Sequence, residues 1–186
     1  MPFIVLYDAN VLYPNTLRDL LIRVAQAGLV QAKWTDRILD ETFRNLKANR
    51  RDLDPTHLDR TRALMNDAIE DVLVTGYEPL INALDLPAVS DRHVLAAAIK
   101  SNAQVIVTQN LKDFPEKYLE PWSIEAQNAD DFVLGLIDLN RQKVYAQVQR
   151  IADTWSRHRP STVDDVLVSL EQGSDPLIGS VAALRG

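Results

Sequence analysis

The sequence of 186 residues contains no cysteine, which excludes a disulfide-stabilised scaffold and a metal site built on thiolates. It also lacks any apolar run that approaches the roughly 18–20 residues a membrane-spanning helix requires. The apolar run at residues 3–7 is too short for the core of a secretory signal, and no basic residue precedes it. We therefore expect a soluble, cytoplasmic protein that has no membrane partner.

Basic residues are outnumbered: 20 Lys and Arg stand against 26 Asp and Glu, so the formal net charge is −6. This balance counts against a protein that holds nucleic acid through an overall positive charge. It does not exclude a nucleic acid ligand, because a bound divalent ion supplies positive charge locally. The apolar share of 46 % is ordinary for a globular chain, and the length suits one domain with or without a short appendage.

The order of the apolar segments predicts an α/β fold. Short continuous apolar runs, typical of strands buried in a parallel sheet, lie at residues 3–7, 72–74 and 105–107. Apolar residues recur at helical spacing in the segments between them, at 17–28, 35–49, 55–69 and 90–99. Because strands that alternate with helices favour parallel βαβ units, we expect a three-layer α/β/α sandwich with a central parallel sheet.

The pattern changes after residue 126. The remaining chain carries apolar residues at helical spacing, two prolines that mark breaks, and no strand signal. The residues concerned are Phe132, Leu136, Leu139, Val144, Val148, Ile151, Trp155, Pro160 and Pro176. We expect the sheet domain to occupy residues 1–126 and a helical C-terminal extension to occupy residues 127–186.

Acidic residues stand where strands end and helices begin. Asp8 directly follows the first apolar run, Asp113 lies in the loop after the last one, and Asp91 lies in the first turn of an alanine-rich helix. Glu41 lies on the second helix. The carboxyl ends of parallel strands share one sheet edge, and carboxylates that meet there repel one another unless a cation neutralises them. An all-oxygen site of this kind suits Mg²⁺ or Mn²⁺.

Each acid also has an ordinary explanation when it is taken alone. Asp8 suits a turn after a strand, and Asp91 suits a favourable charge at a helix N-terminus. Asp113 suits the turn before Pro115, and Glu41 suits an ion pair on the surface of its helix. The joint placement of the four acids, rather than any one of them, favours a metal site.

Three stretches in this order resemble the motifs of PIN-domain ribonucleases. They are IVLYDANVLYP, WTDRILDETFRNL and SDRHVLAAAIKSNAQVIVTQNLKDFP. The resemblance covers roughly residues 3–125, and the last stretch is long enough to be fairly specific. Bacterial members of the family are often VapC-type toxins of toxin–antitoxin pairs.

The resemblance implies an endoribonuclease that hydrolyses RNA phosphodiester bonds with Mg²⁺ or Mn²⁺. Asp8, Glu41, Asp91 and Asp113 would be the catalytic acids and metal ligands. Asp8 and Asp91 would hold the metal directly, while Glu41 would bind it through water or act as the general base. One ion and two ions are both compatible with this set.

The fourth acid departs from the family pattern. Many members have an aspartate two residues after the threonine that ends the strand, whereas this sequence has Asn110 there and its acid at Asp113. We expect Asp113 to be a weak or water-mediated ligand and Asn110 a neutral orienting group. Thr108 is expected to hydrogen-bond a metal-binding carboxylate.

Basic residues recur on the helix that carries Glu41. Arg44, Lys47 and Arg51 follow the spacing i, i+3, i+7, which fits a strip that contacts RNA phosphates and equally fits a solvated helix face. His93 suits a structural role better than general acid catalysis.

The resemblance further implies an RNA substrate, a cognate antitoxin protein and a homodimer. A catalytically silent PIN fold that serves as a binding or regulatory module is the alternative, but such a module has no need of Asp8, Glu41 and Asp91. A phosphotransfer receiver domain would need an aspartate after a middle strand, and Thr75 follows residues 72–74 instead. For the extension, covering a sheet edge, dimerisation and RNA contact all remain open.

Overall fold

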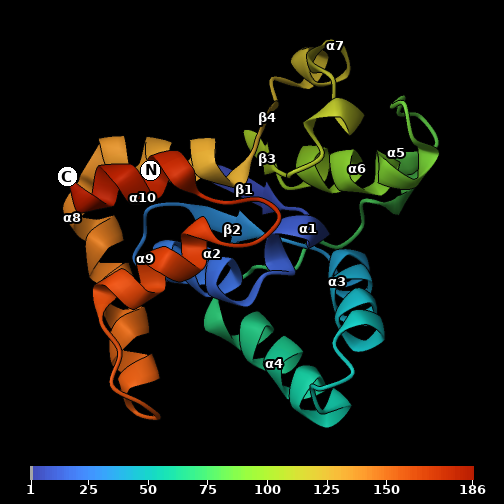
Figure 1. Cartoon of the computed structure of the whole chain (residues 1–186). Helices are drawn as coiled ribbons and strands as arrows, with labels where there is room; N and C mark the ends of the chain where they lie inside the picture. The colour runs from blue at the N-terminus through green and yellow to red at the C-terminus, as the bar shows by residue number, and fades with distance from the viewer. Residues whose placement is uncertain (1) are drawn as a thin grey trace.

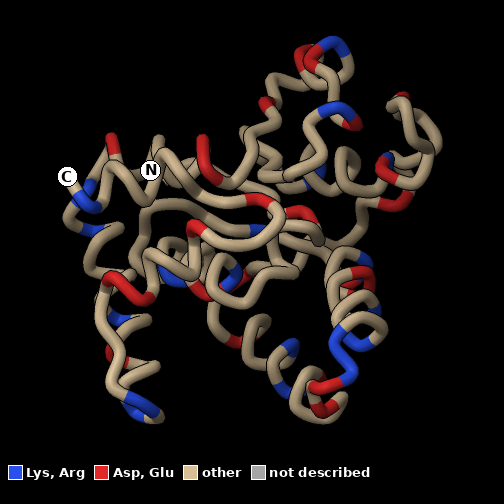
Figure 2. Tube along the Cα trace, in the orientation of Figure 1, with Lys and Arg blue, Asp and Glu red and all other residues tan. Residues whose placement is uncertain are grey.

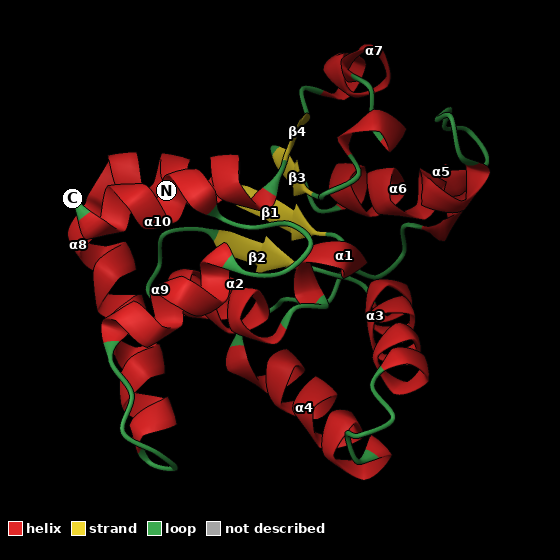
Figure 3. Ribbon diagram, in the orientation of Figure 1, coloured by secondary structure: helices red, strands yellow, loops and turns green. Residues whose placement is uncertain are grey.

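Four parallel strands form one sheet in the order β2-β1-β3-β4 (Figures 1 and 3). The computed structural model describes residues 2–186. The strands are β1 (Ile4–Tyr7), β2 (Gln31–Lys33), β3 (Val105–Val107) and β4 (Glu125–Gln127). The two apolar runs predicted around residues 3–7 and 105–107 are therefore the two central strands, as their burial on both faces requires.

Helices follow and separate the strands along the whole chain. In the first part they are α1 (Ala9–Leu12), α2 (Asn15–Gln26), α3 (Asp36–Asn49), α4 (Pro55–Ala68), α5 (Glu78–Ile81), α6 (Arg92–Lys100) and α7 (Glu116–Leu119). Three 3₁₀ turns, η1 (Val89–Asp91), η2 (Leu111–Asp113) and η3 (Glu120–Trp122), lie among them. The last part consists of α8 (Ala129–Ser156), α9 (Val163–Glu171) and α10 (Ile178–Arg185).

The helices bury the last three residues of the central strand β1, whose first residue is partly buried. The Tyr7 hydroxyl donates a hydrogen bond of 3.1 Å to the Leu21 carbonyl of α2, and the Tyr7 ring lies 5.9 Å from the ring of Phe132 in α8. The alanine-rich helix α6 packs against β1 and β3, where small side chains allow close approach. The sheet is thus flanked by helices, and the predicted three-layer α/β/α sandwich is confirmed.

Local signals place the helix ends where the sequence predicted them. The Thr35 hydroxyl accepts a hydrogen bond from the Ile38 amide and caps α3, and Asp54 caps α4, whose first residue is Pro55. Gly28 follows α2 with a φ of +79°, a conformation that strongly favours glycine. The helices predicted from 35 to 49 and from 55 onward are confirmed.

The strand expected at residues 72–74 is wrong. The pairing is limited to one isolated parallel bridge between Leu73 and Trp34, in which the Val72 carbonyl and the Val74 amide bond to the backbone of Trp34. The edge strands β2 and β4 were not predicted, because each has three residues and lacks the continuous apolar run of a central strand.

The C-terminal helices pack against one another and against α2. Asn140 has non-helical backbone angles and interrupts α8, and its side chain accepts a hydrogen bond of 3.0 Å from the Lys143 amide. Near the start of α8, the Asp130 carboxylate accepts hydrogen bonds of 2.9 and 2.8 Å from the amides of Gly179 and Ser180. This contact fixes the start of α10 on the start of α8. Among the helices of residues 2–186, none has the length and apolar character needed to span a membrane.

Candidate active site

Asp8 lies at the carboxyl end of the central strand β1. Its backbone amide donates a hydrogen bond of 3.0 Å to the carbonyl of Val107, the last residue of β3, so the two strand ends lie side by side. The side chain caps the short helix α1, because its Oδ1 accepts a hydrogen bond of 2.8 Å from the Ala9 amide. Only 7 % of the residue is exposed, so this carboxylate is held in a fixed orientation at the sheet edge.

A hydrogen-bond network joins Asp8 to the loop after β3. The buried Thr108 hydroxyl donates a 2.9 Å hydrogen bond to Asp8 Oδ2. Asn10 Nδ2 lies 3.1 Å from Thr108 Oγ1, and Asn10 Oδ1 accepts a hydrogen bond of 3.0 Å from the Gln109 amide. Thr108 therefore makes the contact with a site carboxylate that the sequence predicted for it, and Asn10 ties the two strand ends together.

The surroundings of Asp8 disfavour the ionised form of its carboxyl group and so raise its pKa. The pKa of Asp8 is raised from the ordinary 3.8 to about 6; burial is the largest cause, and the charges of Glu41 and Asp91 act in the same direction. The hydrogen bonds from Thr108 and Ala9 lower the pKa and so offset part of this effect. A buried carboxylate with a raised pKa beside other acids is typical of a functional site.

Asp91 lies within electrostatic range of both Glu41 and Asp113. Partial burial raises the pKa of Asp91, and the charges of Asp113 and Glu41 raise it further. Asp91 occupies the N-cap position of α6, where a negative charge is favourable, but its side chain makes no capping hydrogen bond and its oxygens remain available to a ligand. Among the ion pairs of residues 2–186, none involves Glu41, so surface pairing does not account for this residue.

The donor set suits a hard cation. Asp8, Glu41, Asp91 and Asp113 offer only carboxylate oxygens, which Mg²⁺ and Mn²⁺ prefer, and a cation would relieve the repulsion that raises their pKa values. Within residues 2–186, no three acids or histidines already converge closely enough to coordinate one ion. These side chains could therefore hold a metal only after rotating about their χ angles or through intervening water.

The loop after β3 contains one residue that sequence reasoning missed. Gln109 Oε1 accepts a hydrogen bond of 3.3 Å from the amide of Ala129, the first residue of α8. This contact depends on how two segments pack in space, and no local pattern indicates it. Asn110 donates its backbone amide to Thr108 Oγ1 at 3.2 Å, while its side chain lines a neighbouring cavity.

The basic residues on α3 differ in their surroundings. Figure 2 shows Lys and Arg positions that follow α3 into the loop before α4. Arg44 and Arg51 are exposed, whereas Lys47 Nζ lies 2.6 Å from Asp59 Oδ1 in an ion pair. Burial and the nearby charge of Arg37 lower the pKa of His93 to about 4, so this imidazole is neutral at pH 7.

Comparison with known proteins gives two family matches. The PIN domain family matches residues 4–112, and the VapC50 C-terminal domain family matches residues 129–186. A protein of Mycobacterium tuberculosis (strain ATCC 25618 / H37Rv), named "Putative ribonuclease VapC50", is 44 % identical over 80 residues. That match spans 43 % of this chain and 47 % of the relative. No solved structure matches the chain. The PIN domain match covers more than half of the sequence and includes the strands that carry Asp8 and Thr108, so the chain belongs to the PIN domain family and is of the VapC type.

Proposed function

We propose that this protein is a metal-dependent endoribonuclease, the toxin of a toxin–antitoxin pair, which hydrolyses RNA phosphodiester bonds with Mg²⁺ or Mn²⁺. The observation that carries the proposal is the buried, oriented carboxylate of Asp8 together with three further acids, Glu41, Asp91 and Asp113. Burial, and to a smaller extent the charges of neighbouring acids, raises the pKa values of Asp8 and Asp91. The relative named a ribonuclease supports the same activity. We treat residues 1–126 as the PIN domain and residues 127–186 as its helical extension.

The residues of the chain have distinct tasks in this reaction. Asp8 and Asp91 would hold the metal, and Thr108 and the Ala9 amide keep the two oxygens of Asp8 in place. Glu41 would accept a proton from the attacking water, directly or through another water. When bound, the metal would supply positive charge that stabilises the phosphoryl transition state. The same local charge would allow a protein with a net charge of −6 to act on a polyanion.

The test of the activity is cleavage of a mixed RNA pool by the purified protein in Mg²⁺ or Mn²⁺. Cleavage should stop on chelation with EDTA. It should also fall more than about hundredfold on Asp8→Asn, because a metal ion contributes several kcal/mol to stabilising the transition state. The exposed Asp153 on α8 provides a matched control, since Asp153→Asn removes one carboxylate far along the extension. Cleavage that persists in EDTA or in Asp8→Asn would refute the mechanism, and a wild-type protein that cleaves no RNA would favour a silent binding module.

A second substitution tests the fourth acid. Asp113 raises the pKa of Asp91 through its charge, and we propose that it contacts the metal through water. Asp113→Asn should therefore lower the cleavage rate about tenfold, as expected for outer-shell contacts, while Asp91→Asn should lower it at least tenfold more. Equal losses for the two variants would make Asp113 a direct ligand. No loss for Asp113→Asn would leave three acids as the complete site.

We also propose a cognate antitoxin and a homodimer, both acting in the cytoplasm. Leu64 on α4 is 61 % exposed beside a shallow groove between α2 and α4, which supports a protein contact on this face. Sedimentation of the purified protein should give twice the mass of one chain. A monomer at micromolar concentration would refute the dimer.

A further inference from the structure

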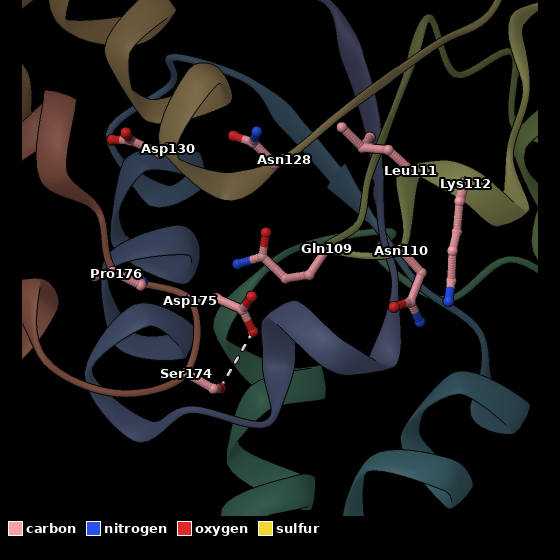
Figure 4. A pocket seen from close by; sticks show the side chains of 9 residues that line it. All are labelled: Gln109, Asn110, Leu111, Lys112, Asn128, Asp130, Ser174, Asp175 and Pro176. Atoms are coloured by element: carbon pink, nitrogen blue, oxygen red, sulfur yellow. Dashed lines mark hydrogen bonds between the residues drawn. The ribbon is translucent and has the colours of Figure 1, made fainter.

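A polar cavity lies beside the acids, between the PIN domain and the C-terminal helices. Its volume is about 510 Å³, which is within the ordinary range for small-ligand sites. Three segments line it: the loop after β3 (109–112), the start of α8, and the loop between α9 and α10 (174–176). Figure 4 shows side chains from all three segments around this space, with the amide of Gln109 extended toward the loop that carries Asp175 and Pro176.

The cavity and the acid site share one wall. The loop after β3 bonds to the acid site through Thr108, whose hydroxyl donates to Asp8, and through the Gln109 amide, which donates to Asn10. The side chain of Gln109 leaves the same loop on the cavity side, where its Oε1 accepts from the Ala129 amide. A polymer bound across the acids would therefore lie against the loop whose residues 109–112 line the cavity.

The groups around the cavity match the edge of a nucleobase. The carboxamide oxygens of Gln109 and Asn128 already accept hydrogen bonds from the amides of Ala129 and Asp131, so these two side chains offer their N–H donors. The carboxamide of Asn110 offers both a donor and an acceptor. Exposed Leu111 and Pro176 offer apolar contacts for a base face. These amides are the side-chain type that reads base edges through paired hydrogen bonds, and single-stranded RNA presents such edges.

The two carboxylates of the cavity differ in how they are engaged. Both carboxylate oxygens of Asp130 accept hydrogen bonds from the amides of Gly179 and Ser180. Asp130 therefore holds the start of α10 in place and is not available to a ligand. Asp175 is exposed, and within residues 2–186 its carboxylate accepts a hydrogen bond only from the neighbouring Ser174 hydroxyl, at 3.2 Å. Asp175 is therefore the acceptor that remains available to the N–H groups of a base.

We propose that this cavity binds one unpaired RNA nucleobase next to the cleaved phosphodiester, and that Asp175 reads the edge of that base. The C-terminal extension thereby supplies sequence preference to a cleavage site built by the PIN domain. This inference rests on the proposed ribonuclease function, because the substrate that reaches the cavity is the RNA held at the acids. Lys112, on the rim, is placed to contact a phosphate of the same strand.

The test measures base preference in binding, separately from cleavage. Short oligouridine RNAs, unsubstituted or with one central adenine, cytosine or guanine, are titrated by fluorescence anisotropy in Mg²⁺ into the full chain carrying Glu41→Gln, which removes the proposed proton acceptor and keeps Asp8 and Asp91. The same titrations are done after adding Asp175→Asn, and after adding Asp153→Asn as the matched control. The first protein should bind at least one substituted RNA more tightly than the unsubstituted RNA. Asp175→Asn should change that ratio about tenfold, the discrimination expected from one lost base contact, and Asp153→Asn should leave it unchanged.

The outcomes separate this proposal from the proposed function. A base preference that is absent, or that persists unchanged in Asp175→Asn, overturns the subsite even if the wild-type protein cleaves RNA. RNA that does not bind at all overturns it as well. A preference that depends on Asp175 in a protein whose wild-type form cleaves no RNA supports the subsite and refutes the nuclease function.

Discussion

Asp8→Asn is expected to stabilise the metal-free protein at neutral pH. The folded protein raises the pKa of Asp8 from 3.8 to about 6, so at pH 7.5 folding forces a charged carboxylate into a site that disfavours it. A rise of about two pKa units corresponds to about 3 kcal/mol of lost stability. Asparagine removes this cost but weakens the hydrogen bonds that Asp8 Oδ2 accepts from Thr108 and Asn10, which costs about 1 kcal/mol. The expected net gain is about 2 kcal/mol.

The sign of this effect depends on pH. Because the folded-state pKa lies above the unfolded value, the cost of the Asp8 charge is absent below about pH 4 and grows as the pH rises to about 6. The cost is fully present at higher pH. Near pH 4 the variant should therefore lose its advantage and be equal to the wild type or slightly less stable.

Thermal and urea unfolding in EDTA at pH 7.5 and pH 4 measure these differences. A gain of about 2 kcal/mol corresponds to a rise in Tm of about 4–8 °C for a chain of this size. Mg²⁺ should then raise the Tm of the wild type and not that of Asp8→Asn, because a ligand stabilises only the fold that binds it. A variant that is less stable than the wild type at pH 7.5 in EDTA would refute the claim that the charged Asp8 carboxylate destabilises the metal-free protein.

Two further substitutions test the surroundings of the site. Thr108→Val removes the hydrogen bond that lowers the pKa of Asp8, so its cleavage rate should fall about tenfold more at pH 6 than at pH 8, given the 1.5–3 kcal/mol of a hydrogen bond to a charged group. Thr108→Ser should restore the wild-type pH profile, and a uniform loss at all pH values would contradict this role. Arg44→Ala should reduce the dependence of RNA affinity on salt by about one ion. Lys47→Ala should change it less, because Asp59 already pairs with Lys47, and equal effects would contradict a contact that is specific to Arg44.

The parts of the fold that the sequence predicts are those specified by local chemistry. An apolar run that ends in an acid identifies both β1 and Asp8, and the helical spacing of apolar residues identifies α3 and α4. The edge strands escape prediction because pairing with a neighbour, rather than their own composition, makes them strands. Residues 72–74 show the opposite error, since an apolar run found no partner along the sheet apart from the single bridge to Trp34.

The candidate site also contains some residues whose positions the sequence predicts and others whose positions depend on tertiary packing. Asp8 and Asp91 are predictable because an acid after a strand or at the start of a helix has a recognisable position. The contact between Gln109 and Ala129, and the cavity that brings residues 109–112 to residues 174–176, depend on the docking of the extension. Segments so far apart in the sequence come together only through tertiary packing, and the spacing of apolar residues along the chain does not indicate which segments will be in contact.

The hydrogen-bond chain from Asp8 through Thr108, Asn10 and Gln109 to Ala129 has a thermodynamic consequence. The same loop borders both the acids and the cavity, so a ligand that favoured this loop geometry at one end would also favour binding at the other end. Coupling of this kind is reciprocal. If RNA in the cavity tightens metal binding at the acids by some factor, the metal tightens RNA binding by the same factor. The two affinities then have to be measured together, because neither is a property of its own site alone.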